Sequence, residues 1–139
     1  WYPDGRRAWL VSEADGHAHL YAVAAAGGAA PARRQLTSGA WEVLDVAYTP
    51  DRRAFFLHTS EGSPFERHAW RMPLDGGARE RLTAAPGGHQ AVLSPDGTRL
   101  ADVASRANVP PELFVQPARP GAAAARLTTS PTAEWRSHP

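Results

Sequence analysis

The stretch Ser94-Pro95-Asp96-Gly97 decides the fold of this chain, because it recurs as Thr49-Pro50-Asp51-Arg52 and as Tyr2-Pro3-Asp4-Gly5. The three prolines lie 47 and 45 residues apart along the chain. A Leu-Thr pair recurs at nearly the same interval, at Leu36-Thr37, Leu82-Thr83 and Leu127-Thr128. An interval of about 45 residues filled with short strands is typical of the blades of a β-propeller. The repeat therefore predicts an all-β fold in which each copy forms one blade.

The second copy shows the expected content of a blade most clearly. Residues 42–48 and 54–59 read as strands rich in β formers, and Thr49-Pro50-Asp51-Arg52 turns the chain between them. Residues 68–74 and 80–83 read as two further strands, separated by a Gly-Gly hairpin signal. Four antiparallel strands joined by short connections make one propeller blade.

The other two copies follow the same plan. Strands are expected in the first copy at 8–13, 18–23 and 34–37, and in the third at 90–94, 100–105, 113–115 and 126–128. The first copy lacks most of its first strand. Longer loops are expected after the second strand at 60–66 and 106–112, and after the third strand at 24–32 and 117–125. A loop can lengthen at little cost, because the entropy of loop closure grows slowly with length.

The three copies divide the chain into blades of approximately 1–39, 40–84 and 85–129. A propeller closes with about 4–8 blades, so three four-stranded blades predict part of a larger ring. Residues 130–139 carry no further repeat and are expected to be an exit linker toward another domain.

Large apolar residues recur at matching places in the copies. Trp9, Phe55 and Leu100 fall near matching places in the second strands, allowing one residue of slip at Arg52, and Tyr21, Trp70 and Phe114 fall in the third strands. Each blade must bury its faces against its neighbours. We therefore expect these six side chains to form the core between blades.

Composition excludes several classes of function. The net charge is +1, so nothing favours a nucleic acid or a membrane surface as partner, and no apolar run is long enough to span a membrane. The chain has no cysteine, which excludes disulfides, a thiolate nucleophile and a cysteine-ligated metal.

No arrangement of residues predicts chemistry in the chain itself. There is no Gly-x-Ser-x-Gly nucleophile elbow, no His-Glu-x-x-His motif and no phosphate loop with a lysine. The Ser/Asp pair of the repeated turn is best explained by turn formation, because the serine becomes Thr49 and Tyr2 in the other copies. We predict no catalytic, cofactor-binding or metal-binding residue.

Three sets of residues are candidates for a functional role. His17 and His19 would share one strand face, as two metal ligands do, although a polar strand edge fits them better. Ser12-Glu13 and Ser60-Glu61 stand at strand ends, where such residues usually close turns. Trp41-Glu42 is the least repeated element, and we favour an aromatic ring packed at the entrance of a blade over one that faces a ligand.

An ordered set of motifs points to a family. It comprises Ser12-Glu13-x-Asp15-Gly16-x-x-His19-Leu20-Tyr21, Gln35-Leu36-Thr37-Ser38-Gly39-x-Trp41-Glu42-Val43, Glu66-Arg67-His68-x-Trp70-Arg71, Leu74-Asp75-Gly76-Gly77, and Ser105 followed by Pro110-Pro111-Glu112-Leu113. This succession resembles the last blades of the propeller in the dipeptidyl peptidase IV branch of the prolyl oligopeptidase family. The Ala-rich loops, and Arg52 in place of the turn glycine, depart from that pattern and leave the subfamily open.

The resemblance implies a propeller of about seven or eight blades beside an α/β-hydrolase domain. The parent protein would be a serine exopeptidase that removes Xaa-Pro or Xaa-Ala dipeptides from peptide N-termini, in the periplasm or outside the cell, and a homodimer is its implied assembly. The family's Ser-Asp-His triad and its paired substrate glutamates have no matching positions here. This segment would shape and gate access to an active site outside it.

Other readings stay open. The Ser-Pro-Asp-Gly repeat fits equally well a TolB-like propeller that binds other proteins and has no enzymatic activity. An acylaminoacyl-peptidase-like member of the same family is a closer rival.

Overall fold

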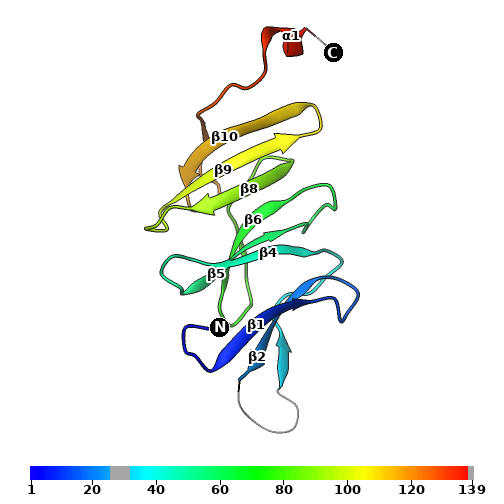
Figure 1. The fold of residues 1–139 in the computed structure, drawn as a ribbon, viewed down its shortest axis with the longest axis vertical. Helices are drawn as coiled ribbons and strands as arrows, with labels where there is room; N and C mark the ends of the chain where they lie inside the picture. Colours follow the sequence, from blue (N-terminus) through cyan, green and yellow to red (C-terminus); the bar gives the residue numbers. More distant parts are fainter. Residues whose placement is uncertain (26–31, 138–139) are drawn as a thin grey trace.

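Three antiparallel sheets, one for each sequence repeat, are stacked along the long axis of the molecule (Figure 1). The structure is a computed structural model that describes residues 1–25 and 32–137. The chain runs from the first sheet near the N-terminus to the third sheet near the C-terminus, so consecutive repeats are neighbours in space (Figure 1). The sheets are three successive blades of a β-propeller, as the repeat predicts.

The strands of each blade pair in chain order, each with the one before it. The first blade holds β1 (Arg7–Ser12), β2 (His19–Ala24) and β3 (Arg33–Gln35). The second holds β4 (Val43–Tyr48), β5 (Ala54–Thr59), β6 (His68–Pro73) and β7 (Glu80–Arg81). The third holds β8 (Gly88–Leu93), β9 (Arg99–Arg106), β10 (Val109–Pro117) and β11 (Ala125–Arg126), and is followed by one short helix, α1 (Ala133–Arg136).

The repeated Pro-Asp turn joins the first and second strands of a blade. Its aspartate accepts the N–H of the residue two positions on, over 3.1 Å at Asp51 and 3.0 Å at Asp96. The residue directly after the aspartate has a positive φ, of 71° at Gly97 and 56° at Arg52. Glycine enters this region without strain, whereas arginine does so at a cost. The conserved shape of the turn thus survives the one substitution that breaks the motif.

Alternate residues of each strand face the preceding and the following blade. Between the first and second blades lies a core that includes Leu20, Leu36, Phe55, Leu57 and Met72. Between the second and third blades lies a second core, made of Phe56, Ala69, Leu82, Ala91 and Leu100. The cores therefore lie between sheets, where each blade buries the face that its neighbour presents.

The two outer faces of the stack remain uncovered. The leucine of the Leu-Thr pair is 9% exposed at Leu36 and 1% at Leu82, but 60% at Leu127, which faces away from the second blade. At the other end, Leu10 occupies the place of the fully buried Leu57 and is 39% exposed. Positions that the repeat buries are thus open at both ends of the segment.

Two sequence-based expectations are sharpened or corrected by the structure, and the first is the one residue of slip allowed between the second strands. The backbone bonds that close the turns run from Tyr2 N–H to the Arg7 carbonyl and from Thr49 N–H to the Ala54 carbonyl. Phe55 therefore corresponds to Ala8, and Trp9 corresponds to the next residue, Phe56. Trp9 still packs between blades, with its ring centroid 6.1 Å from that of Phe55. The match among Tyr21, Trp70 and Phe114 is confirmed, because each pairs with the residue before a Leu-Thr pair.

The expected loop at 106–112 is the second correction. β9 continues to Arg106, β10 begins at Val109, and Val109 pairs with Arg106 across a tight hairpin. Pro110 and Pro111 lie where the register shifts between Val109 and Glu112. A proline lacks the N–H of a regular ladder but is tolerated at such an irregularity. Residues 60–67 do form a connection without regular strands, while the middle of the 24–32 stretch lies outside the described residues.

Candidate functional site

A buried polar contact, here called the clasp, explains why each repeat keeps its Leu-Thr pair. In the first blade the Thr37 hydroxyl accepts the Leu20 N–H over 2.9 Å and lies 3.1 Å from His19 Nδ1. In the second blade Thr83 makes the same two contacts, with the Ala69 N–H at 3.0 Å and His68 Nδ1 at 3.1 Å. The clasp ties the end of the outermost strand to the start of the third strand.

The third blade keeps the clasp but changes the partner. Thr128 accepts the Leu113 N–H over 2.9 Å, and its hydroxyl donates to the carboxylate of Glu112, which stands where the other blades have histidine. Glu112 also accepts from Arg126 Nη2 and from the Ser130 N–H, each over 2.6 Å. The carboxylate is therefore fully engaged, and it also anchors the chain as it leaves the last strand.

Acid should loosen this third clasp. Burial alone would raise the pKa of the Glu112 carboxyl, but bonds from Thr128, Ser130 and Arg126 outweigh it and lower the pKa to about 2, from a usual 4.5. A carboxyl with a lowered pKa stabilises the fold above its unfolded pKa, and that contribution is lost as pH falls. We expect the free energy of unfolding to fall between pH about 4.5 and about 2, and Glu112→Gln to weaken that dependence.

The measurement is urea denaturation at several pH values. Glu13→Gln, which changes an exposed carboxylate, serves as the matched control and should leave the pH dependence intact. An unchanged acid profile in Glu112→Gln would show that the clasp carries no such energy.

One clasp resembles a catalytic triad in composition. His68 lies between the Thr83 hydroxyl on Nδ1 and the Glu66 carboxylate, 2.9 Å away, on Nε2. In a serine-type triad the nucleophile sits on Nε2 and the acid on Nδ1, and the nucleophile is accessible. Thr83 is 1% exposed and already accepts a backbone N–H. The bond from a backbone N–H to the threonine hydroxyl recurs in all three blades, with or without a histidine, so the threonine serves the fold.

His17 and His19, weighed as metal ligands, lie apart in role. His19 is the buried clasp residue of the first blade, and its Nε2 lies 3.0 Å from the Gly39 carbonyl. His17 precedes β2 and contacts Glu42 over 3.1 Å. Within residues 1–25 and 32–137, no group of three or more His, Asp or Glu side chains could hold a metal ion.

Trp41 and Glu42 border a hollow of about 280 Å³ at the entrance of the second blade. The Trp41 ring packs edge-on against His19, with centroids 4.9 Å apart, and the Arg79 guanidinium lies 4.8 Å from its centre. The Glu42 carboxylate accepts the Ala18 N–H and so joins the first blade to the second. The favoured interpretation of Trp41 as a packed aromatic ring fits these contacts.

The Ser-Glu pairs at the strand ends are not equivalent. Ser12 pairs with His19 and Thr59 pairs with His68, so Ser60 corresponds to Glu13 and not to Ser12. The Ser60 hydroxyl accepts the Glu42 N–H over 2.9 Å. Glu61 forms an ion pair with Arg79 over 2.8 Å. Both contacts join residues 18 positions apart, so the side chains of the second pair link neighbouring segments and do not close a turn.

The strongest departure from the repeat was not anticipated from the sequence. His89 and Asp102 occupy the places of Val43 and Leu57 in the preceding blade, yet all four are buried. His89 Nδ1 lies 2.6 Å from an Asp102 oxygen, and Nε2 lies 2.7 Å from the Ala85 carbonyl. Burial lowers the pKa of His89, but these two acceptors more than compensate and the pKa is raised. A buried ion pair replaces an apolar pair.

Comparison with known proteins places these blades in a family. Residues 1–111 match the family model described as the dipeptidyl peptidase IV (DPP IV) N-terminal region. The crystal structure of Porphyromonas gingivalis dipeptidyl peptidase 4 is similar, with a TM-score of 0.68 and 24% identity over 93% of this chain and 18% of that one. TolB from Acinetobacter baumannii is also similar, with a TM-score of 0.64 and 20% identity over 95% of this chain and 32% of that one.

Proposed function

Because this chain belongs to the family of dipeptidyl peptidase IV N-terminal regions, we propose that it is a non-catalytic propeller segment of a serine exopeptidase. The whole protein would remove Xaa-Pro or Xaa-Ala dipeptides from peptide N-termini. This segment would shape the cavity and gate access to an active site in an α/β-hydrolase domain outside it. The observation that carries the proposal is the family match over residues 1–111.

The contacts of the repeated residues support a scaffold role. The clasp residues His19, His68 and Glu112 are buried and engaged by threonine, and the turn aspartates bond their own backbone. These contacts hold the strands of each blade together, and the buried clasp residues are not accessible to a substrate. The chain spans 18% and 32% of the two similar solved chains, which leaves room in such proteins for a separate catalytic domain.

We expect the isolated chain to give no turnover of glycyl-prolyl-p-nitroanilide, whereas the intact protein releases p-nitroaniline. The reason is that, among the described residues, the hydroxyls that lie on a histidine, those of Thr37 and Thr83, are buried, and the Ser94 hydroxyl donates only to the turn carboxylate of Asp96. The measurement is absorbance of the released chromophore at matched protein concentrations. Turnover by the isolated chain would overturn its non-catalytic role, and an inactive intact protein would overturn the peptidase assignment.

The similarity to TolB supports a second candidate, a propeller that binds other proteins without catalysis. The two candidates differ in the rest of the protein. A hydrolase domain with a Gly-x-Ser-x-Gly elbow favours the peptidase, and further propeller repeats alone favour the binding module. Loss of activity on mutating the serine of that elbow in the intact protein is the direct test.

Several finer features belong to the same proposal. Residues 130–139 would lead to the hydrolase domain, short peptides would be the substrates, and the whole protein would function as a homodimer in the periplasm or outside the cell. Among the described residues, no helix is long and apolar enough to cross a membrane.

A further inference from the structure

Every blade directs two of its connections to the same end of its strands, here called the turn end. The Pro-Asp turn joins the first two strands there, and the link between the third and fourth strands lies beside it, since Ala54 pairs with Pro73. The turn ends of successive blades are in contact. Gly97 lies against Pro50 of the preceding blade, and Arg7 of the first blade bonds Asp75 of the second over 2.6 Å. The three blades therefore present one continuous surface at this end.

Exposed arginines gather on the turn end of all three blades. Their side chains form no hydrogen bond or ion pair with another described residue, and they are Arg6, Arg33, Arg52, Arg53, Arg99 and Arg119. Two of them lie over tyrosine rings, Arg33 over Tyr21 and Arg52 over Tyr48, and such a contact leaves the positive charge in place. A guanidinium group stays charged at every physiological pH. The turn end thus carries six cationic groups that are open to solvent.

The carboxylates of the turn end are fewer and are already engaged. Asp4 and Asp75 both pair with Arg7, over 3.0 and 2.6 Å. Glu80 pairs with Arg71 over 2.6 Å. The other two lie in the Pro-Asp turns, where they accept backbone N–H groups, and they are Asp51 and Asp96. These carboxylates do not neutralise the six exposed arginines, so the turn end has an excess of positive charge.

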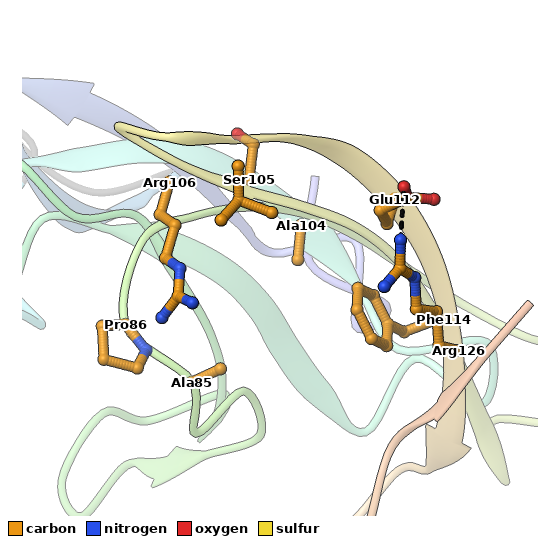
Figure 2. A pocket seen from close by; sticks show the side chains of 9 residues that line it. Ala85, Pro86, Ala104, Ser105, Arg106, Glu112, Phe114 and Arg126 are labelled. Carbon is orange, nitrogen blue, oxygen red and sulfur yellow. Dashed lines mark hydrogen bonds and ion pairs between the residues drawn. The ribbon is translucent and has the colours of Figure 1, made fainter. Parts of the chain in front are cut away.

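The opposite end of the strands is arranged differently. Figure 2 shows part of it, where Arg126 meets the Glu112 carboxylate over 2.6 Å. Arg79 pairs with Glu61 over 2.8 Å. Arg106, across the hollow from Arg126 in Figure 2, is exposed and has no side-chain bond to another described residue. The net charge of +1 therefore conceals an uneven distribution, in which the exposed and unpaired arginines lie mainly on the turn end.

We propose that the turn end docks on a bilayer surface of anionic phospholipid, with the exposed arginines bound to lipid phosphates. A guanidinium group presents its donors in a plane and matches the oxygens of a phosphate. The arginines are spread over three blades, and packed sheets lie about 10 Å apart. A bilayer is flat and its lipids diffuse laterally, so it can supply a phosphate to every arginine. An acidic protein would need carboxylates placed to match three separate turns. The expectation from the sequence, that nothing favours a membrane surface, considered only the sum of the charges.

The test is sedimentation of the intact protein with vesicles of phosphatidylcholine alone, or of equal parts phosphatidylcholine and phosphatidylglycerol. We expect binding to the anionic vesicles, at least tenfold weaker binding to the neutral ones, and release at about 1 M salt, where the screening length falls to about 3 Å. Equal binding to both vesicles, or no binding to the anionic ones, would overturn the proposal. Tighter binding to a DNA duplex or to polyglutamate would also overturn it, because the partner would then be a soluble polyanion.

Variants locate the docking surface. Arg53→Gln should weaken binding to the anionic vesicles about fivefold, and its combination with Arg6→Gln and Arg99→Gln, one change in each blade, about 100-fold. Arg106→Gln removes the same charge from the opposite end and should leave binding unchanged. All four side chains are exposed and unbonded, so the variants should keep the fold, which thermal unfolding checks.

Full binding by the triple variant, or an equal loss in Arg53→Gln and Arg106→Gln, would exclude the turn end. The readout is binding to vesicles and involves no turnover, so its failure leaves the peptidase proposal untouched.

Discussion

Phe55→Ala is expected to destabilise the protein by about 3–5 kcal/mol, the usual cost of removing a buried phenylalanine side chain. Phe55 is fully buried between the first two blades. Its ring stacks on Tyr48 with centroids 5.2 Å apart and meets the rings of Tyr2 and Trp9 edge-on, at 5.7 and 6.1 Å. Removal of the Phe55 ring leaves a cavity among the three remaining aromatic rings, which cannot easily move to close it.

Phe65→Ala is the matched control, since the same atoms are removed from a ring that is 93% exposed. It should change stability by no more than about 0.5 kcal/mol. Urea denaturation followed by tryptophan fluorescence reports both variants, and Trp9 lies beside the substituted ring in the first. Equal stability of the two variants would contradict the assignment of the core to the space between blades.

Asp102→Leu alone is expected to destabilise the protein by about 3–5 kcal/mol, because it leaves a buried His89 without its carboxylate. Adding His89→Val restores the apolar pair that the preceding blade holds at Val43 and Leu57. The double variant should recover the loss, and apolar replacement of a buried ion pair often adds about 1–4 kcal/mol of stability. The cycle of single and double variants, measured by urea denaturation, isolates the coupling.

The opposite ordering would be informative. If the double variant were less stable than either single variant, the pair would contribute to stability beyond what an apolar pair provides. If Asp102→Leu alone were neutral, His89 and Asp102 would not be coupled.

The fold was predictable because the repeat is carried by residues with local physical roles. Asp51 and Asp96 fix the turn through bonds to backbone groups only two residues away, so the turn can be recognised from a short stretch of sequence. The Leu-Thr pair is equally easy to recognise in the sequence. Its structural role is the clasp with His68 or Glu112, which lie 15 and 16 positions earlier. The residue that contacts the threonine is histidine in two blades and glutamate in the third, so the equivalence of these three positions is not apparent from the sequence.

The errors arose where size or residue type was taken as a guide to position. Size alone places Trp9 near Phe55 only to within one residue, and the backbone bonds of the turn fix the register, so that Ala8 corresponds to Phe55 and Trp9 to Phe56. Pro110 and Pro111 favoured a loop, but they lie at an irregularity that lets β10 continue. In both cases the hydrogen-bond register, which sequence does not display, decided the outcome.

The candidate site was beyond the reach of sequence for a different reason. His89 and Asp102 are 13 residues apart and have no motif in common. Their signal is a departure from the apolar residues of the preceding blade, and it appears only after the blades are aligned by register.

The exposure of Leu127 at one end of the stack and Leu10 at the other has a consequence for symmetry. These leucines lie on different faces of a blade. Leu127 lies on the face that a blade turns toward the following blade, and Leu10 lies on the face turned toward the preceding blade. The stack therefore has a direction, because its two ends present different and mutually complementary blade faces. A blade added at either end would therefore have to present its opposite face, so the blades of a ring built from this repeat must all run in the same direction around it.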